Sequence, residues 1–407
     1  MPNATVVLVG TLDTKGTEYG YLRDRIREAG ADVLLVDAGV LGEPLLAADI
    51  PREEVARAAG ADHAELRAAA DRGRAVDVMG RGAGVVLGRL HAEGRLQGAA
   101  AVGGSGNSSI AAQAMRELPV GVPKLIVSTV ASGDTRPYVG AVDITMMYSV
   151  VDISGINRIS ARILTNAAGA IAGMARAAPP AGTGERPLVG ATMFGVTTPC
   201  ITRARERLEE LGYEVLVFHA TGTGGQSFEA LATGGFLAGA LDATTTELAD
   251  DLVGGVLSAG PERLEAVGRA GLPQVVSVGA LDMVNFGPRE TVPERFAGRT
   301  LYVHNPTVTL MRTTAQENAE LGRRIAAKLR DATGPTVLFV PLGGVSAIDV
   351  EGQPFHDPEA DAALFAALRE GLEGSAVEVR ELGQDVNDPA FATAMADELH
   401  ALIQDAR

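Results

Sequence analysis

A glycine- and serine-rich segment at residues 103–109 has the composition of a loop that holds a phosphate. The apolar run 97–102 before it predicts a buried strand, and residues 110–116 after it have a helical pattern. Glycines let backbone N–H groups approach a ligand, and the start of a helix adds the positive end of its dipole. The alternative is an ordinary turn between a strand and a helix. The residues expected to contact a phosphate here are Gly103, Gly104, Ser105, Gly106, Asn107 and Ser108.

A second segment of this kind, residues 10–18, follows the strand predicted over residues 5–9 and leads into an amphipathic helix. The spacing of a Walker A loop is absent. Lys15 could neutralise phosphate charge, and Asp13 could bind Mg²⁺ directly or through water. Alternatively, Lys15 is solvated and Asp13 or Thr14 caps the helix. The contacts expected from this segment are Gly10, Thr11, Asp13, Thr14 and Lys15.

The second half of the chain has its own polar residues at predicted strand ends. His219 ends one strand and precedes a further glycine-rich loop, residues 220–227. An imidazole changes charge near neutral pH, so His219 is a candidate for ligand binding or acid/base chemistry, although a lone histidine is more often structural. The substrate contacts expected from the loop are Thr221, Gly222, Gly224 and Gly225.

Carboxylates supply further candidates. Glu247 and Asp250 would share one face of a helix and could both reach a metal or a substrate. Alternatively, Glu247 completes a capping box with the threonines of 244–246. Asp282 follows another predicted strand and is a third candidate.

Residues 301–314 are predicted to end a strand at His304 and to begin a helix that contains Arg312. Arginine presents a planar fork to carboxylates and phosphates, which makes both residues candidate substrate contacts. The alternative is that Asn305 and Pro306 only start a helix and Arg312 forms a surface salt bridge.

The elements that must position these residues indicate an α/β fold, because predicted strands alternate with helical patterns throughout. A chain of 407 residues is too long for one ordinary core. A segment rich in proline and glycine predicts an N-terminal α/β domain over residues 1–180, a linker over 181–187 and a C-terminal α/β domain over 188–407. Both halves begin as strand, hydroxyl-rich loop, helix, glycine and strand. This suggests an internal duplication giving two Rossmann-like domains with mainly parallel sheets, although such units also resemble one another in general.

Charge and cysteine content narrow the class of protein. The net charge of −16 argues against nucleic acid or an anionic membrane as the main partner. The single Cys200 excludes an intrachain disulfide and a multi-cysteine zinc site. With no signal-peptide pattern and no run of 18 apolar residues, we expect a soluble cytoplasmic protein. The apolar segment 144–153 favours a homo-oligomer, or it is simply a buried strand and helix.

Seven motifs occur together in an order that resembles a known family. They are GTLDTKG (10–16), GGSGN (103–107), VSTVASGD (127–134), MMYSVVDI (146–153), FHATGTGG (218–225), TTTELAD (244–250) and HNP (304–306). Together they resemble the ATP-binding family named after the tomato mosaic virus resistance protein, whose bacterial two-domain members are uncharacterised. The resemblance covers nearly the whole chain. One departure is Ser108, where threonine is the commoner residue, but the hydroxyl is kept.

The resemblance implies an N-terminal domain that binds ATP, without implying a reaction. The phosphates would contact the loops 10–16 and 103–108, and Asp13 or Asp134 would assist Mg²⁺. Further donors would come from Ser128, Thr129, Ser132 and Gly133. The catalytic candidates, presented across an interdomain cleft, would be His219, Glu247, Asp282 and His304.

Our leading hypothesis is an ATP-dependent enzyme that activates a small acidic or hydroxylated metabolite by phosphoryl or nucleotidyl transfer. One alternative is a nucleotide-gated binding or regulatory protein without turnover. Another is a metal-dependent hydrolase or lyase that ATP modulates.

Overall fold

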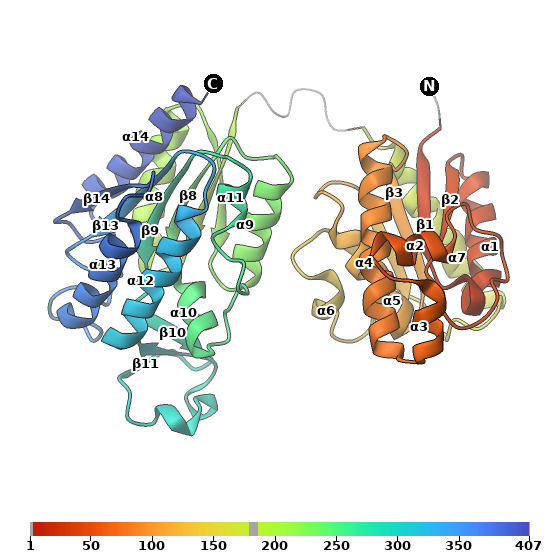
Figure 1. Ribbon diagram of the computed structural model, residues 1–407, viewed down its shortest axis with the longest axis horizontal. Helices are drawn as coiled ribbons and strands as arrows, with labels where there is room; N and C mark the ends of the chain where they lie inside the picture. The colour runs from red at the N-terminus through yellow and green to blue at the C-terminus, as the bar shows by residue number, and fades with distance from the viewer. Residues whose placement is uncertain (1–2, 179–185, 407) are drawn as a thin grey trace. The chain divides into compact units, whose positions relative to one another are not determined.

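The computed structural model describes residues 3–178 and 186–406. The chain divides into two compact units, Met1–Ala181 and Gly182–Arg407, which we call the N unit and the C unit (Figure 1).

The N unit contains a five-stranded parallel sheet in the order β2-β1-β3-β4-β5. The three central strands are short apolar runs buried on both faces, as is typical of parallel strands covered by helices, whereas the edge strand β5 is partly exposed. The order reverses between β1 and β3, and open α/β sheets bind ligands beside the carboxyl ends of the strands at such a point. The strands are β1 (Thr5–Gly10), β2 (Asp32–Asp37), β3 (Gly98–Gly103), β4 (Lys124–Ser128) and β5 (Ile144–Tyr148).

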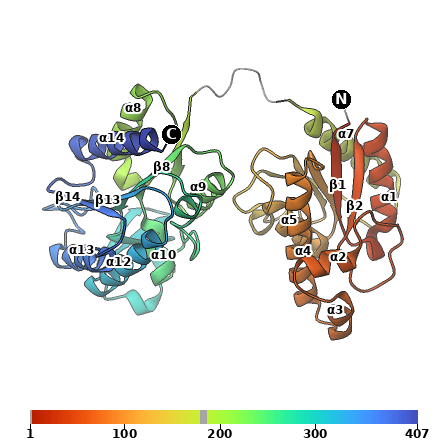
Figure 2. The same ribbon diagram turned by 45° about the horizontal axis from the view of Figure 1, so that its top comes forward.

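Helices cover both faces of this sheet. Along β1, Val6 and Leu8 face α1 and α7, whereas Val7 and Val9 face the layer that contains α4 and α5. α4 and α5 lie side by side in both views (Figures 1 and 2). The helices are α1 (Leu12–Glu28), α2 (Arg52–Ala58), α3 (His63–Ala69), α4 (Arg72–Ala92), α5 (Ser105–Arg116), α6 (Arg136–Val139) and α7 (Arg158–Arg176).

The C unit contains a six-stranded parallel sheet in the order β14-β13-β9-β8-β6-β7. Its first five strands in chain order are arranged as β7-β6-β8-β9-β13, which repeats the topology of the N unit and agrees with the predicted duplication. A three-stranded antiparallel sheet, β10-β12-β11, is added after β9. The strands are β6 (Leu188–Met193), β7 (Glu214–His219), β8 (Gly239–Thr244), β9 (Gln274–Gly279), β10 (Met283–Phe286), β11 (Leu301–Asn305), β12 (Val308–Arg312), β13 (Thr336–Pro341) and β14 (Glu378–Leu382).

The large sheet of the C unit is also covered on both faces. α8 and α14 share one core with it, and α10, α12 and α13 share another on the opposite face. The helices are α8 (Thr198–Glu210), α9 (Thr223–Thr233), α10 (Thr246–Val253), α11 (Ala266–Arg269), α12 (Ala315–Arg330), α13 (Pro358–Leu372) and α14 (Pro389–Asp405). Three 3₁₀ turns are η1 (Gly195–Thr197), η2 (Arg289–Thr291) and η3 (Glu294–Phe296).

The α/β class and the two Rossmann-like sheets are confirmed, but two helix starts differ from the prediction. α1 begins at Leu12 and α5 at Ser105, so most of each predicted phosphate loop is the first turn of a helix. Lys15 alone interrupts α1, with φ −127° and ψ 16°. The predicted linker 181–187 lies mostly outside the described residues and stays a prediction.

The prediction that Arg312 lies in a helix is wrong. Residues 301–312 form an antiparallel hairpin, β11 and β12, and Arg312 is the last residue of β12. The helix starts later because Thr314 caps it. The hydroxyl of Thr314 accepts from the amide of Glu317, and the carboxylate of Glu317 accepts from the amide of Thr314, which completes a capping box.

No helix in residues 3–178 or 186–406 is long and apolar enough to span a membrane.

Candidate functional site

In the N unit, a buried tyrosine and a buried asparagine join the carboxyl ends of β1 and β3. The hydroxyl of Tyr19 donates to the carbonyl of Val9 (2.7 Å) and accepts from the amide of Val102 (3.1 Å). Asn107 Nδ2 donates to this phenol oxygen (2.8 Å) and to the carbonyl of Val102 (2.6 Å). Asn107 Oδ1 accepts from the amide of Thr11 (3.1 Å). These bonds fix the two predicted phosphate segments against each other, so Asn107 has a positioning role.

The glycines of these segments fall into two groups. A Cβ at Gly10 would lie 1.9 Å from the hydroxyl of Tyr19, and one at Gly103 would lie 2.6 Å from Cβ of Asn107. Gly10 and Gly103 therefore make room for protein side chains. The sequence predicts instead that they make room for a ligand. At Gly104 and Gly106 the nearest atoms to a Cβ would be 3.6 Å and 3.4 Å away.

The first turn of α5 has open backbone donors. The amides of Ser105, Gly106 and Asn107 lie in the turn that has no intrahelical acceptors, and Gly104 at the N-cap has no side chain to accept from them. Thr129 Oγ1 lies 3.6 Å from the Cβ position of Gly104. In the described part of the chain this hydroxyl makes no hydrogen bond. The turn therefore offers amides, a helix dipole and a hydroxyl to an anion.

Other residues predicted to contact the nucleotide are engaged within the protein. The hydroxyls of Ser108 and Ser128 share a buried hydrogen bond of 2.7 Å, and Ser128 also accepts from the amide of Val130 (3.2 Å). The amide of Gly133 donates to the carbonyl of Val130 (3.0 Å), while Ser132 is exposed. Ser108 and Ser128 thus hold the loop after β4 in place.

Asp13 points toward the loop after β2. Its Oδ2 accepts from the amides of Leu41 and Gly42, both at 3.0 Å, and lies 3.9 Å from Arg52 Nη1. Its Oδ1 is buried without a hydrogen-bond partner, 2.7 Å from the Cβ position of Gly39. The side chain therefore braces this loop.

Lys15 and Thr14 have local partners. Lys15 Nζ donates to the carbonyl of Ile153 in the loop after β5, and Thr14 shares a hydroxyl hydrogen bond of 2.7 Å with Thr11. Among the described residues, no carboxylate lies within 4.0 Å of Lys15. The charge of Lys15 is therefore not neutralised by an ion pair.

Asp134, the other predicted Mg²⁺ ligand, lies on the surface. Both of its oxygens accept from Arg136, at 2.9 Å and 2.8 Å, and these hydrogen bonds lower the pKa of Asp134 to about 2. In residues 3–178 and 186–406, no group of three or more histidine, cysteine, aspartate or glutamate side chains is arranged so that it could hold a metal ion.

A cation near the first turn of α5 was not predicted. Arg72 Nη2, from the first residue of α4, lies 3.4 Å from the Cβ position of Gly106. The helix before β3 must begin at the carboxyl edge of a parallel sheet. However, two short helices precede α4, and no sequence pattern showed which of the three would lie beside α5.

In the C unit, a fully buried arginine collects three carboxylates, and we call this group the Arg263 cluster. Arg263 binds Asp242 through both terminal nitrogens, at 2.5 Å and 2.6 Å. Its Nε donates to Glu247 (2.7 Å), and its Nη1 also donates to Glu229 (3.0 Å). Burial lowers the pKa of Arg263, but the charges of Asp242 and its other partners outweigh this and raise it.

Glu247 uses its other oxygen on the predicted substrate loop. Its Oε1 accepts from the amides of Gly222 (2.6 Å) and Gly225 (3.0 Å). These two amides are therefore closed to a substrate anion. A Cβ at Gly224 would lie 1.8 Å from the carbonyl of His219, so this glycine also serves close backbone packing. The predicted capping box of Glu247 is not formed.

Asp250 lies on the same helix as Glu247 but has different partners. It accepts from the amides of Asn285 and Leu257, both at 2.7 Å. Burial raises its pKa to about 7.

A second buried group, which we call the Arg312 cluster, contains Arg312, Asp282, Asp349 and Asp361. Arg312 Nη2 donates to Asp349 (3.0 Å) and Asp361 (2.7 Å), and its Nε donates to the carbonyl of Phe355 (2.7 Å). The charges of Arg312 and Asp282 also interact. The structure thus brings two predicted site residues, Asp282 and Arg312, together and adds two aspartates that the sequence did not suggest.

Carboxylates outnumber cations in the Arg312 cluster by three to one. Burial raises the pKa of Asp349 to about 9, and the charges of Asp282 and Asp361 act in the same direction. Burial also raises the pKa of Asp282 to about 7, against the opposing charge of Arg312. One carboxyl group therefore keeps its proton at neutral pH.

The Arg312 cluster borders a cavity of about 200 Å³ between the loop after β13 and the start of α13. Asp349, Asp361 and His356 supply its polar walls, and Phe365 and Leu342 supply apolar ones. His356 Nδ1 lies 3.2 Å from the carbonyl of Asp349. The side chain of Asp361 is slightly exposed, whereas that of Asp349 is fully buried.

The two predicted catalytic histidines lie outside both clusters. His219 ends β7 with its ring edge-on to Phe194, the centroids 5.5 Å apart. His304 lies on the exposed hairpin strand β11, with its ring centroid 6.5 Å from that of Tyr302. Nothing in their surroundings assigns a catalytic role, which stays a prediction.

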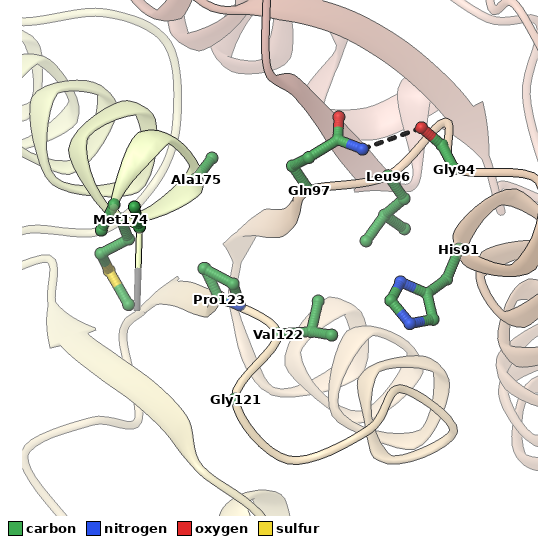
Figure 3. Close-up of a pocket in the computed structure, with 11 residues that line it drawn as sticks. His91, Gly94, Leu96, Gln97, Gly121, Val122, Pro123, Met174 and Ala175 are labelled. Atoms are coloured by element: carbon green, nitrogen blue, oxygen red, sulfur yellow. Dashed lines mark hydrogen bonds between the residues drawn. The ribbon is translucent and has the colours of Figure 1, made fainter. Parts of the chain in front are cut away.

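Two larger cavities of the N unit lie at the opposite, amino edge of its sheet. One, of about 510 Å³, has the ring of His91 and the side chains of Leu96, Val122 and Met174 around it (Figure 3). The other, of about 650 Å³, is lined by residues at the starts of β1 and β2. No predicted site residue lines either of them.

Comparison with known proteins places the chain in a family. The model of the Uncharacterised protein family (UPF0261) N-terminal domain matches residues 4–180, and that of its C-terminal domain matches residues 186–403. A UPF0261 protein of Clostridium tetani is 54% identical over 98% of both chains, and UPF0261 protein RA0729 of Rhizobium meliloti is 49% identical over 96% of both. The ToMV resistance protein Tm-1(GCR237) of Solanum lycopersicum is 41% identical over 96% of this chain and 55% of its own length. The predicted resemblance is thus confirmed, and the chain belongs to the UPF0261 family.

Proposed function

We propose that the N unit binds ATP, with the phosphates on the first turn of α5 where the strand order reverses. The observation that carries this proposal is the open set of amides at Ser105, Gly106 and Asn107. Glycine at positions 104 and 106 leaves space beside these amides, and Thr129 adds a hydroxyl. A helix start of this kind at the carboxyl edge of a parallel sheet suits a phosphate. The resemblance to an ATP-binding family points in the same direction.

The predicted Mg²⁺ ligands do not fit a metal site made by the protein. Asp13 has one oxygen without a partner, but this atom lies beside Gly39 in the loop after β2 and an arginine lies beside its other oxygen. Asp134 has both oxygens on Arg136. Because Mg²⁺ commonly stays hydrated and bound to the phosphates themselves, ATP would bring the ion with it, and we assign it no step.

Whether ATP is consumed distinguishes the leading hypothesis, a phosphoryl- or nucleotidyl-transfer enzyme, from a nucleotide-gated binding protein. The test is a calorimetric titration of Mg·ATP into the full chain and into Lys15→Ala, followed by nucleotide analysis after incubation with a panel of acidic and hydroxylated metabolites. We expect saturable binding that Lys15→Ala weakens. ATP consumption that depends on one metabolite supports the enzyme, and intact ATP throughout supports the gated binding protein. No binding to the wild type overturns the proposal.

A second candidate function, acid/base catalysis on a small substrate in the C unit, is favoured by the proton that burial keeps on Asp349 beside the 200 Å³ cavity. In any activity found with this unit, Asp349→Asn should abolish turnover at every pH. The surface variant Glu351→Gln should not. Full activity in Asp349→Asn contradicts this candidate.

A further inference from the structure

The outer edge of β5 in the N unit is uncovered, whereas the equivalent edge in the C unit carries another strand. The shared strand order makes β13 the counterpart of β5, and β13 pairs in parallel with β14 on its outer side. In the described part of the chain, β5 pairs with β4 and with no other strand. The repeated fold therefore has a place for one more strand beside β5.

The backbone groups on this edge are free to pair. The amide of Ser149 donates to the carbonyl of Ser128 at the end of β4 (3.2 Å), and successive residues of a strand face opposite sides of a ladder. The N–H and C=O groups of Met146 and Tyr148 therefore point away from β4. Within residues 3–178 and 186–406, these groups make no hydrogen bond. An unpaired edge of this kind is a template for a further strand.

β5 also lacks the charges that commonly protect an edge. Its sequence ITMMY has no charged residue, and the side chains of Thr145 and Tyr148 are exposed. The outermost strand of the C unit, β14, has the sequence EVREL, and Arg380 in it pairs with Glu378 and Glu398. Charged side chains on an edge strand discourage pairing with another chain. The C unit is thus protected at the edge where the N unit is not.

The loop after β5 displays a further apolar side chain in a strained conformation. Val150 is 61% exposed and has a φ of 62°, which is unfavourable for a β-branched residue. Two residues of α1 hold the loop in place. Lys15 Nζ donates to the carbonyl of Ile153, and the carboxylate of Glu18 accepts from the amide of Gly155 (2.7 Å). Strain that the surroundings maintain occurs mostly at functional sites, so an exposed valine held in this way points to contact with another molecule.

We propose that the N unit binds a second copy of this chain through β5, so that two five-stranded sheets join across a two-fold axis. Such an axis relates two identical strands that pair in antiparallel fashion. With Met147 on the axis, Met146 of each copy lies opposite Tyr148 of the other, and each of these pairs exchanges both main-chain hydrogen bonds. A chain with a net charge of −16 repels its copy, which favours contact through an uncharged strand. The inference goes beyond nucleotide binding and does not depend on it.

The first test is sedimentation equilibrium of the full chain over a series of concentrations. We expect the wild type to reach twice the chain mass of 41.9 kDa. Tyr148→Pro removes an outward amide from both copies and should raise the dissociation constant of the dimer at least about 10-fold. Thr145→Lys places a charge on the edge, leaves every backbone amide in place, and should act in the same direction. Circular dichroism of both variants checks that they fold.

A cysteine variant tests the register of the pairing. Met147→Cys would set two sulfur atoms across the two-fold axis, and the only native cysteine, Cys200, is buried. We expect this variant to form an intermolecular disulfide on mild oxidation, detected by electrophoresis without reductant. The matched control is Val303→Cys on the exposed edge strand β11, which should cross-link much more slowly.

Three results would overturn the proposal. The first is a wild type that stays monomeric throughout the concentration series. The second is a dimer whose dissociation constant is unchanged in folded Tyr148→Pro and Thr145→Lys. The third is a dimer in which Met147→Cys cross-links no faster than Val303→Cys, because the two copies would then meet at another surface or in another register.

Discussion

The helix that follows the third strand of each sheet begins in a different chemical environment in the two units. In the N unit, the second residue of α5 is Gly106, and the amides around it have no acceptor within the helix. In the C unit, the second residue of α10 is Glu247, a buried carboxylate that accepts from two glycine amides and from Arg263. The same topology thus leaves a place for an external anion in one unit and fills the corresponding place with an internal anion in the other. Strand order alone does not identify a binding site.

The largest expected effect comes from Arg263→Met, which breaks the internal arrangement of the C unit. The substitution leaves two buried carboxylates, Asp242 and Glu247, and the partly buried Glu229 without their cation, and breaking a buried ion pair costs about 3–5 kcal/mol. We expect a loss of this size in the free energy of unfolding of the C unit, measured by denaturant titration. The control Arg269→Ala removes an arginine that pairs on the surface with Glu265, and it should cost less than about 1 kcal/mol. Equal losses in the two variants would show that the Arg263 cluster is not a stabilising unit.

Gly106→Glu is expected to convert the open site of the N unit into a filled one. The carboxylate would occupy the position on α5 that Glu247 occupies on α10, and it would be held there by Arg72. We expect at least about a 100-fold loss of ATP affinity, equivalent to about 2.7 kcal/mol. Gly106→Gln, which is similar in size but uncharged, should lose much less. Calorimetric titration checks both variants, and equal losses would indicate a steric effect instead.

Tyr19→Phe should loosen the connection between the segments that follow β1 and β3. Removal of the hydroxyl leaves the Val102 amide and one Asn107 donor without this acceptor, which costs about 1–3 kcal/mol for a buried group. The N unit should lose stability by this amount and also bind ATP more weakly. Tyr21→Phe is the control, because the hydroxyl of Tyr21 bonds to Thr165 and Ala161 on α7, away from this point. A variant Tyr19→Phe that is as stable as the wild type would argue against the positioning role.

The free energy of unfolding of the C unit should fall as the pH rises. That of the N unit around α5 should not show this trend. Burial raises the pKa of Asp282 to about 7 and that of Asp349 to about 9, whereas both titrate near 3.8 in the unfolded chain. Between about pH 4 and pH 9 the folded state therefore keeps protons that the unfolded state releases. The free energy of unfolding therefore falls as the pH rises through that range.

Hydrogen exchange of α13 and α5, followed from pH 5 to pH 9, measures this difference after correction for the intrinsic rates. Protection of α13 should fall with pH, and Asp349→Asn should flatten the decline because its amide cannot release a proton. A decline of the same size in Asp349→Asn would assign the effect to other groups.

The sequence predicted the parts of the molecule that depend on neighbouring residues. Apolar runs and glycine positions gave the α/β class, a first strand over residues 5–9, which the structure extends to Gly10, and the repeated start of the two halves. Helix starts were less accurate, because Ser105 and Leu12 belong to helices whose first turns have the composition of loops. The hairpin of β11 and β12 was missed because its second strand is followed directly by a helix.

The chemistry of the two sites was less predictable, because it depends on residues far apart in the sequence. Asp282 and Arg312 were each recognised, but Asp361 joins them from a helix 49 residues beyond Arg312. Arg263 follows no strand and lies in a connecting segment, so nothing near it in the sequence shows that it is buried. Arg72 is one of several arginines near the start of α4, and only the packing of α4 on α5 distinguishes it.

The fit of Gly10 against Tyr19 has a consequence for reading related sequences. An added methyl group at position 10 would meet the phenol ring at 2.4 Å, so the two residues can change size only together. A relative with alanine at position 10 should carry a smaller side chain at position 19, whatever it binds. Gly104 and Gly106 are under no such restriction from the protein, so larger residues there would point to a lost or altered ligand.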